Sequence, residues 1–286
     1  MQEFWRELRV NVPGAELAGS LCTPVGKLRS VILMLPGSGR STRDNEGYFQ
    51  DLRTDLVGAG HAVAAFDKRG AGQSTGSYYD STIETQCADA AAWLAAAGDA
   101  QPGIPQGVFG HSQGGWVAFE AGAALDSLSF VISSSGPAVG PAPQERARHL
   151  HQVEPERRDE FADAFDRLVV AANEARPYEQ VLPLFRELAP FIDNMEELLR
   201  DGPPAWKLES ALFSYDPTPA LKQLRTPTLV LHGANDTTIP VDDSIRALAK
   251  IGNANIESAI IPETGHRMDG QKYRSTVARF IDHWLD

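Results

Sequence analysis

Gly110-His111-Ser112-Gln113-Gly114 is the stretch of this 286-residue chain that indicates its fold most strongly. The short apolar run Val108-Phe109 precedes it, and residues 116–124, which have a helical composition, follow it. A G-x-S-x-G pattern between a strand and a helix is typical of a sharp, strained turn, which explains why glycines flank the serine. The turn exposes the serine hydroxyl, and the helix directs its first N–H groups toward the same place. Because the pattern also arises by chance in glycine-rich chains, the rest of the sequence has to support it.

The composition is that of an ordinary globular protein, with 42% hydrophobic and 22% charged residues. A net charge of −12 argues against nucleic acid or an anionic membrane as a partner. Charges stand at the N-terminus where a signal peptide has its apolar core, and no apolar run is long enough to span a bilayer, so we expect a cytoplasmic protein. The cysteines, Cys22 and Cys87, are expected to be reduced and buried. No clustered spacing suggests a metal, and we expect no cofactor.

Strand-like and helix-like segments alternate along most of the chain, as in a mostly parallel α/β sheet. Residues 3–23 predict two strands joined near Pro13-Gly14 at an edge of that sheet. Further strands are predicted at 30–35, 62–66, 128–132, 227–231 and 256–261, and helices at 46–59, 81–97, 241–250 and 270–285. Asp44 or Asn45 is the expected cap of the first of these helices.

The alternation stops between about Pro141 and Tyr215, where no strand-like run occurs. A stripe of apolar residues on one helix face is formed by Phe161, Phe165, Leu168, Val169 and Ala172. Prolines separate further helical pieces at 178–189, 191–200 and 204–214. We therefore predict a core domain of residues 1–140 and 216–286 and a helical cap of residues 141–215.

A serine nucleophile needs a base, and the base needs an orienting acid. In an open parallel α/β sheet, catalytic groups follow the carboxyl ends of the strands. Asp236 follows the predicted strand 227–231, and His266 follows the strand 256–261. The chain order Ser112, Asp236, His266 is the order that accompanies a G-x-S-x-G turn. These three residues are therefore the predicted catalytic triad.

Other carboxylates and histidines lack this placement. Asp242 and Asp243 are alternatives for the acid, but both fall at the start of the next helix. Residues 133–136, after the strand that follows the serine, contain no carboxylate. His111 is expected to point away from the serine, and His232 to shape its turn. The remaining histidines are expected to be surface or structural residues: His61, His149, His151 and His283.

Four linked pieces of sequence together resemble the α/β-hydrolase superfamily. They are Leu35-Pro36-Gly37-Ser38-Gly39, Asp67-x-Arg69-Gly70-x-Gly72-x-Ser74, the turn around Ser112, and His232-Gly233-x-x-Asp236 with Gly265-His266. The resemblance covers essentially the whole chain outside the insertion. Within the superfamily, the sequence looks like capped bacterial esterases and serine-aminopeptidase-like hydrolases. It implies an α/β-hydrolase fold with a helical cap inserted after the strand that follows the nucleophile.

An oxyanion hole should use the backbone N–H of Gln113, the residue after the nucleophile. By resemblance to the family's histidine-glycine-x pattern, the second donor is Ser38, with Gly37 as the alternative. This chain has Pro36 where many members have histidine, and for this reason Gly37 stays an alternative to Ser38.

Two arginines beside this loop, Arg40 and Arg43, either hold an acidic substrate group or simply fix the loop. The glycine-rich segment from Asp67 to Ser74 does not match G-x-x-x-x-G-K-[ST], and we interpret it as structural.

The expected function is hydrolysis of carboxylic esters of small to medium acyl chain, through an acyl-enzyme on Ser112. Thioesterase, carbon–carbon hydrolase and aminopeptidase activities of the same fold are alternatives. A non-catalytic ligand-binding protein with this fold is an alternative from a different class. The sequence leaves a homo-oligomer open. Aromatic residues of the insertion either wall an apolar acyl pocket or pack the insertion onto the core: Phe161, Phe165, Phe185, Phe191, Trp206, Phe213 and Tyr215.

Overall fold

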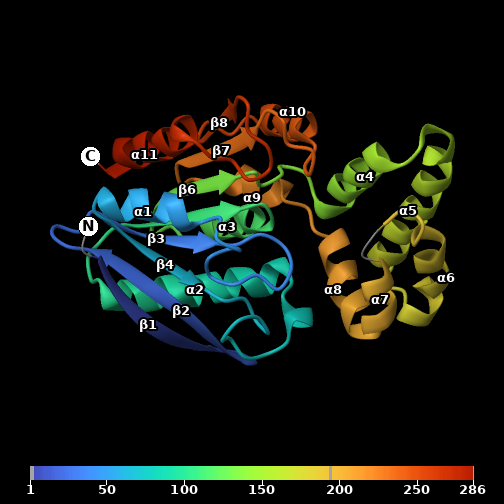
Figure 1. The fold of residues 1–286 in the computed structure, drawn as a ribbon, viewed down its shortest axis with the longest axis horizontal. Helices are drawn as coiled ribbons and strands as arrows, with labels where there is room; N and C mark the ends of the chain where they lie inside the picture. The colour runs from blue at the N-terminus through green and yellow to red at the C-terminus, as the bar shows by residue number, and fades with distance from the viewer. Residues whose placement is uncertain (1–2, 193–194, 286) are drawn as a thin grey trace.

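The computed structural model describes residues 3–192 and 195–285. In this part of the chain the strands form one sheet of eight, in the order β1-β2-β4-β3-β5-β6-β7-β8 (Figure 1). The strands are β1 Glu3–Val12, β2 Ala15–Pro24, β3 Ser30–Leu35, β4 His61–Phe66, β5 Gln106–His111, β6 Leu128–Ser134, β7 Thr228–Gly233 and β8 Ile256–Ile261. β1 pairs antiparallel with β2 and β2 with β4, and the remaining neighbours are parallel. The predicted mostly parallel sheet with an edge hairpin is confirmed.

Helices cover both faces of the sheet. One face is covered by α1 Gln50–Gly58 and α11 Gln271–Leu285. The other is covered by α2 Ile83–Ala100, α3 Gln113–Ala124, α9 Thr218–Gln223 and α10 Val241–Ile251. Strands such as β3 and β4 are therefore buried along their whole length, which explains their continuous apolar sequences. None of the described helices is both long and apolar enough to cross a membrane.

The predicted burial of the two cysteines is only partly correct. Cys22 lies buried in β2, on the face covered by α1 and α11. Cys87 lies on α2 and is only half-buried.

A group of helices is inserted between β6 and β7, which we call the helical insertion. It contains α4 Pro141–Gln152, the 3₁₀ turn η2 Pro155–Arg157, α5 Arg158–Asn173, α6 Tyr178–Leu188, α7 Met195–Asp201 and α8 Pro203–Phe213. These helices stand beyond the ends of the sheet's strands rather than on either face (Figure 1). They enclose an apolar cluster of their own, which includes the predicted stripe on α5. Part of the predicted helix 191–200 falls on residues 193–194, outside the described residues.

The predicted start and cap of the helix 46–59 are wrong. α1 begins only at Gln50, and no side chain caps it. Before it the chain turns tightly, because Asn45 and Glu46 have positive φ values of 50° and 57°. The side chain of Asn45 is used elsewhere, since its Oδ1 accepts a hydrogen bond of 3.2 Å from the backbone N–H of Gly37. A residue that looked like a helix cap therefore holds the loop after β3.

Candidate active site

Ser112 sits between β5 and α3 in a strained backbone conformation, with φ 53° and ψ −119°. The turn is so tight that a Cβ atom on Gly110 would lie 2.0 Å from the carbonyl oxygen of Gly114. A Cβ on Gly114 would lie 2.4 Å from the carbonyl oxygen of Leu35. The two flanking glycines are thus required by direct contact, as the sequence pattern indicated.

The structure brings together the three residues predicted to form the triad. Nε2 of His266 lies 3.0 Å from Oγ of Ser112, and its Nδ1 lies 2.8 Å from Oδ2 of Asp236. All three residues follow the carboxyl ends of parallel strands, β5, β7 and β8. Both distances are within hydrogen-bond reach, so a proton can pass from the serine to a histidine that the carboxylate orients.

Backbone contacts fix the acid and the histidine. Oδ1 of Asp236 accepts hydrogen bonds from the backbone N–H groups of Thr238 at 2.8 Å and Ile239 at 3.2 Å, and its side chain is fully buried. The carbonyl oxygen of His266 accepts a hydrogen bond of 2.7 Å from Oγ of Ser135. These contacts hold Asp236 against His266, and His266 against the serine.

Other candidates lie away from this contact. Asp242 and Asp243 are exposed on the first turn of α10, and Asp243 pairs with Arg246. His111 is buried beside the site: its Nδ1 lies 3.2 Å from the carbonyl oxygen of Ser134, and its ring packs 5.0 Å from that of His266. Burial lowers the pKa of His111 to about 3, so the ring stays neutral at physiological pH.

The loop after β3 approaches the serine from the other side. The backbone N–H of Gly37 is already engaged by Asn45, and the carbonyl of Ser38 accepts a hydrogen bond of 2.8 Å from Oγ of Ser41. Ser38, Gln113 and Ser112 line the same cavity. This arrangement favours Ser38 over Gly37 as the second N–H donor facing the serine.

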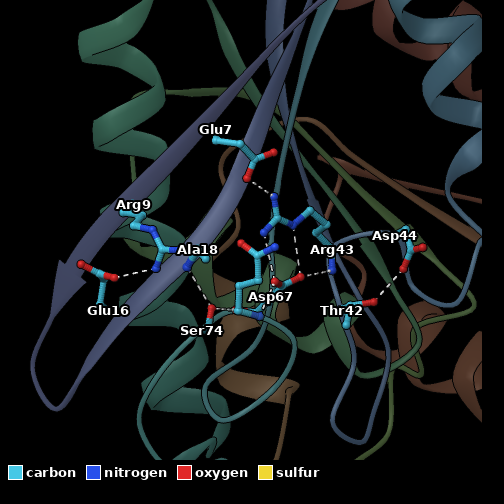
Figure 2. Close-up of polar contacts among 10 residues, drawn as sticks. Glu7, Arg9, Glu16, Ala18, Thr42, Arg43, Asp44, Asp67 and Ser74 are labelled. Atoms are coloured by element: carbon cyan, nitrogen blue, oxygen red, sulfur yellow. Dashed lines mark hydrogen bonds and ion pairs between the residues drawn. The ribbon is translucent and has the colours of Figure 1, made fainter.

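Arg43 has its charge satisfied within the fold, so the structure favours the loop-fixing interpretation of this residue. It contacts Asp67 through Nη2 at 3.0 Å and Nε at 3.2 Å, and Glu7 of β1 through Nη1 at 2.7 Å (Figure 2). These contacts tie the loop after β3 to the loop after β4 and to the edge strand. Arg40 packs over the rings of Tyr78 and Tyr79, with distances of 4.8 and 5.2 Å to the ring centres.

A cavity of about 310 Å³ opens above Ser112, between the sheet and the helical insertion. Much of its wall consists of apolar side chains from the insertion: Phe165, Leu168, Ile192, Met195, Leu208 and Leu212. Of the seven aromatic residues considered for this wall, Phe165 and Phe213 line the cavity. Others pack within the insertion, as Phe185 does against Trp206, with ring centres 5.5 Å apart.

Charged side chains also line the cavity, which the sequence did not reveal. Glu145, Arg148 and His149 of α4 line it together with Glu209 of α8. Arg148 donates hydrogen bonds to Glu145 at 3.0 and 2.5 Å, so the carboxylate of Glu145 balances the charge of the guanidinium. Glu209 is a further acidic residue in the cavity wall. Burial and the nearby Glu145 raise the pKa of Glu209 to about 7. His149, expected to be a surface or structural residue, instead lines the cavity.

The sheet order, the strained serine and the insertion define an α/β-hydrolase, as the structural comparisons also show. An esterase from Pyrococcus furiosus matches with a TM-score of 0.69 at 17% identity, over 99% of this chain and 92% of its own. A carboxyl esterase from Bacillus coagulans, solved with glycerol, gives 0.69 at 15% identity over 99% of both chains. Proline iminopeptidase from Mycobacterium smegmatis matches with a TM-score of 0.67 at 19% identity, over 98% of this chain and 99% of its own.

Residues 26–270 match the family model described as serine aminopeptidase, S33, so the chain belongs to this family. A curated relative is the monoacylglycerol lipase of Mycolicibacterium smegmatis, which is 24% identical over 96% of this chain and 94% of its own. The protein is therefore a hydrolase of the α/β-hydrolase fold, similar to esterases and lipases. The predicted superfamily is confirmed.

The raised pKa of Glu209 makes stability depend on pH. The ordinary pKa of 4.5 is raised to about 7 in the folded protein, so between these values the folded state binds a proton that the unfolded state has released. The free energy of unfolding should therefore fall as pH rises from about 4.5 to 7, by at most about 3 kcal/mol from this group. Glu209→Gln should remove this part of the dependence in urea unfolding at pH 5 and pH 8.

Glu197→Gln is the matched control, because Glu197 lines the same cavity but is exposed. Its unfolding free energy should follow the wild type at both pH values. Parallel pH profiles for the wild type and Glu209→Gln would contradict the assignment of the raised pKa.

Proposed function

We propose that the protein hydrolyses carboxylic esters of small to medium acyl chain through an acyl-enzyme on Ser112. The observation that carries the proposal is the chain of contacts from Ser112, which lines the cavity, to His266 and from His266 to Asp236. A serine hydroxyl is a weak nucleophile unless a base takes its proton, and this base is held in place by a buried carboxylate.

In the proposed mechanism, Oγ of Ser112 attacks the ester carbonyl carbon and its proton passes to Nε2 of His266. The carbonyl oxygen becomes an oxyanion, which accepts hydrogen bonds from the backbone N–H groups of Ser38 and Gln113. The tetrahedral intermediate collapses, and the alcohol leaves with the proton from His266. Water then attacks the acyl-enzyme by the same route and releases the acid. The scheme needs no cofactor, because each proton transfer is assigned to a side chain.

The size and lining of the cavity support an ester of modest length. Its volume of about 310 Å³ is near the lower end of the range for small-molecule sites. The apolar wall from the insertion suits an acyl chain. The esterase and lipase names of the similar proteins agree with this substrate class.

The charged wall favours a second candidate, hydrolysis of an acyl group that carries a free amine. Four carboxylates line the cavity, namely Glu145, Glu197, Asp201 and Glu209, whereas Arg148 is the arginine among its lining residues. An ammonium group would be attracted there, and it would favour the ionised form of Glu209. The names serine aminopeptidase and proline iminopeptidase among the comparisons agree with this alternative.

Substitution of the triad tests the mechanism. Ser112→Ala should abolish ester hydrolysis, roughly 10⁶-fold in kcat, and Asp236→Asn should lower it by roughly 10³–10⁴-fold, because the wrong imidazole tautomer then faces the serine. Asp243→Asn is the control, since its carboxylate lies exposed on α10, and it should keep near wild-type kcat. A Ser112→Ala variant with a tenth of wild-type kcat would exclude the proposed nucleophile. Loss of activity in Asp243→Asn with full activity in Asp236→Asn would move the acid to α10.

A matched pair of substrates separates the two candidates. The p-nitrophenyl esters of hexanoic acid and of 2-aminohexanoic acid differ only in the amine. Under the ester proposal, kcat/KM for hexanoate should equal or exceed that for the amino ester. If the second candidate is right, the amino ester should be preferred by roughly 10- to 100-fold, the strength of a charged hydrogen bond, and Glu209→Gln should remove this preference.

A further inference from the structure

Lys68, the residue after Asp67 in the loop that follows β4, is buried next to the active site with only 4% of its surface exposed. Its Nζ donates a hydrogen bond of 2.5 Å to the carbonyl oxygen of Gly37 and one of 2.7 Å to Oε1 of Gln113. These partners belong to the two segments that face Ser112: the loop after β3 and the first residue of α3. One amine therefore holds both segments together.

The contact with Gly37 fixes the direction of the next N–H group. A trans peptide is planar, so the C=O of Gly37 and the N–H of Ser38 belong to one rigid unit and point in opposite directions. With the carbonyl held by the buried Lys68, the N–H of Ser38 points away from this amine, and Ser38 itself lines the cavity together with Ser112. Hydrogen bonding to the carbonyl also polarises the peptide, which strengthens its N–H as a donor.

The contact with Gln113 acts on the other donor. The backbone N–H of Gln113 is the first of α3, and its side-chain Oε1 is held by Lys68 at 2.7 Å and by Nε2 of Gln86 at 3.3 Å. Fixing the side chain restricts the residue whose N–H should face the oxyanion. Burial lowers the pKa of Lys68 to about 7, because removing the charged ammonium group from water costs free energy.

We propose that Lys68 is the positioning residue of the oxyanion hole, which aligns the N–H groups of Ser38 and Gln113 and stabilises the oxyanion through them. The inference rests on the proposed ester hydrolysis at Ser112. A preorganised donor pair acts on the charge that develops in the transition state and contributes little to binding of the neutral ester. The signature of Lys68 is therefore an effect on kcat without a matching effect on KM.

The test compares Lys68→Met with the wild type on one p-nitrophenyl ester and two ketone inhibitors of equal chain length. A trifluoromethyl ketone adds to Oγ of Ser112, passes the serine proton to His266 and places its oxyanion in the hole, whereas the methyl ketone binds without adding. We expect kcat to fall roughly 10- to 100-fold and KM to change less than about threefold. Affinity for the trifluoromethyl ketone should fall by the same factor as kcat. Affinity for the methyl ketone should stay at the wild-type value.

Arg43→Met is the matched control, because Arg43 anchors the same loop through Asp67, whereas the Gly37 carbonyl is held by Lys68. It should lower stability while keeping the ratio of the two ketone affinities at the wild-type value. Equal loss of affinity for both ketones in Lys68→Met, with the same pattern in Arg43→Met, would show that Lys68 only supports the loop. Wild-type kcat in Lys68→Met would also overturn the inference.

If Lys68→Met does not fold, Gln113→Met decides the question, because it removes one of the two acceptors of Lys68 and keeps the backbone N–H. It should lower kcat by roughly tenfold and weaken the trifluoromethyl ketone selectively. Unchanged values for both would overturn the inference. If the wild type hydrolyses the ester and Ser112→Ala does not, the proposed function holds, and a negative result with these variants counts against the role of Lys68 alone.

Discussion

The positive φ of Ser112 is the constraint on which the site depends. A residue with a side chain adopts φ 53° only when its surroundings enforce it, and here they do so by close contact. Gly110 packs so closely against the carbonyl oxygen of Gly114 that a Cβ would not fit, and Gly114 packs in the same way against the carbonyl oxygen of Leu35. The strain at the serine is therefore stabilised by the packing of β5 and α3 against β3. The same packing places the loop after β3 opposite the serine, so the nucleophile and the N–H donors are fixed together.

Around this turn, charged side chains hold loops rather than substrate. Arg43 joins Asp67 and Glu7, and Lys68 joins Gly37 and Gln113 (Figure 2 for the first group). The glycine-rich segment after β4 is thus a structural support for the loop after β3. The cavity above has a different character, because the helical insertion supplies apolar side chains on one part and carboxylates on another. In the proposed mechanism the core provides the reactive groups, and the insertion provides much of the cavity wall.

The fold and the meeting of Ser112, Asp236 and His266 at one edge of the sheet were predictable, because local patterns encode them. Continuous apolar runs mark strands buried on both faces, and Asp236 closely follows such a strand, β7. His266 follows β8, an edge strand that is mostly half-buried or exposed and was recognised by its alternation with the flanking helices. The interactions that could not be predicted are long-range or depend on orientation. Asn45 looked like a helix cap because its type and position fit one, yet its side chain reaches Gly37.

Two further groups show the same limit. Lys68 gave no signal beyond its place two residues after a buried strand, since its partner Gln113 lies 45 positions away in sequence. Glu209 and Glu145 lie on different helices, and only the packing of α8 near α4 brings both to one cavity. The charge of that cavity depends on tertiary structure, and helix periodicity carries no information about it.

The central claim, an activated nucleophile at Ser112, is tested most directly by covalent labelling of the whole folded protein. A fluorophosphonate probe reacts quickly only with a serine whose proton is taken by a base. Mass spectrometry of the labelled protein should find one adduct, on Ser112, and heat-denatured protein should give none. An adduct on Ser38, Ser133 or Ser134 instead, or no adduct at all on the folded protein, would contradict the account.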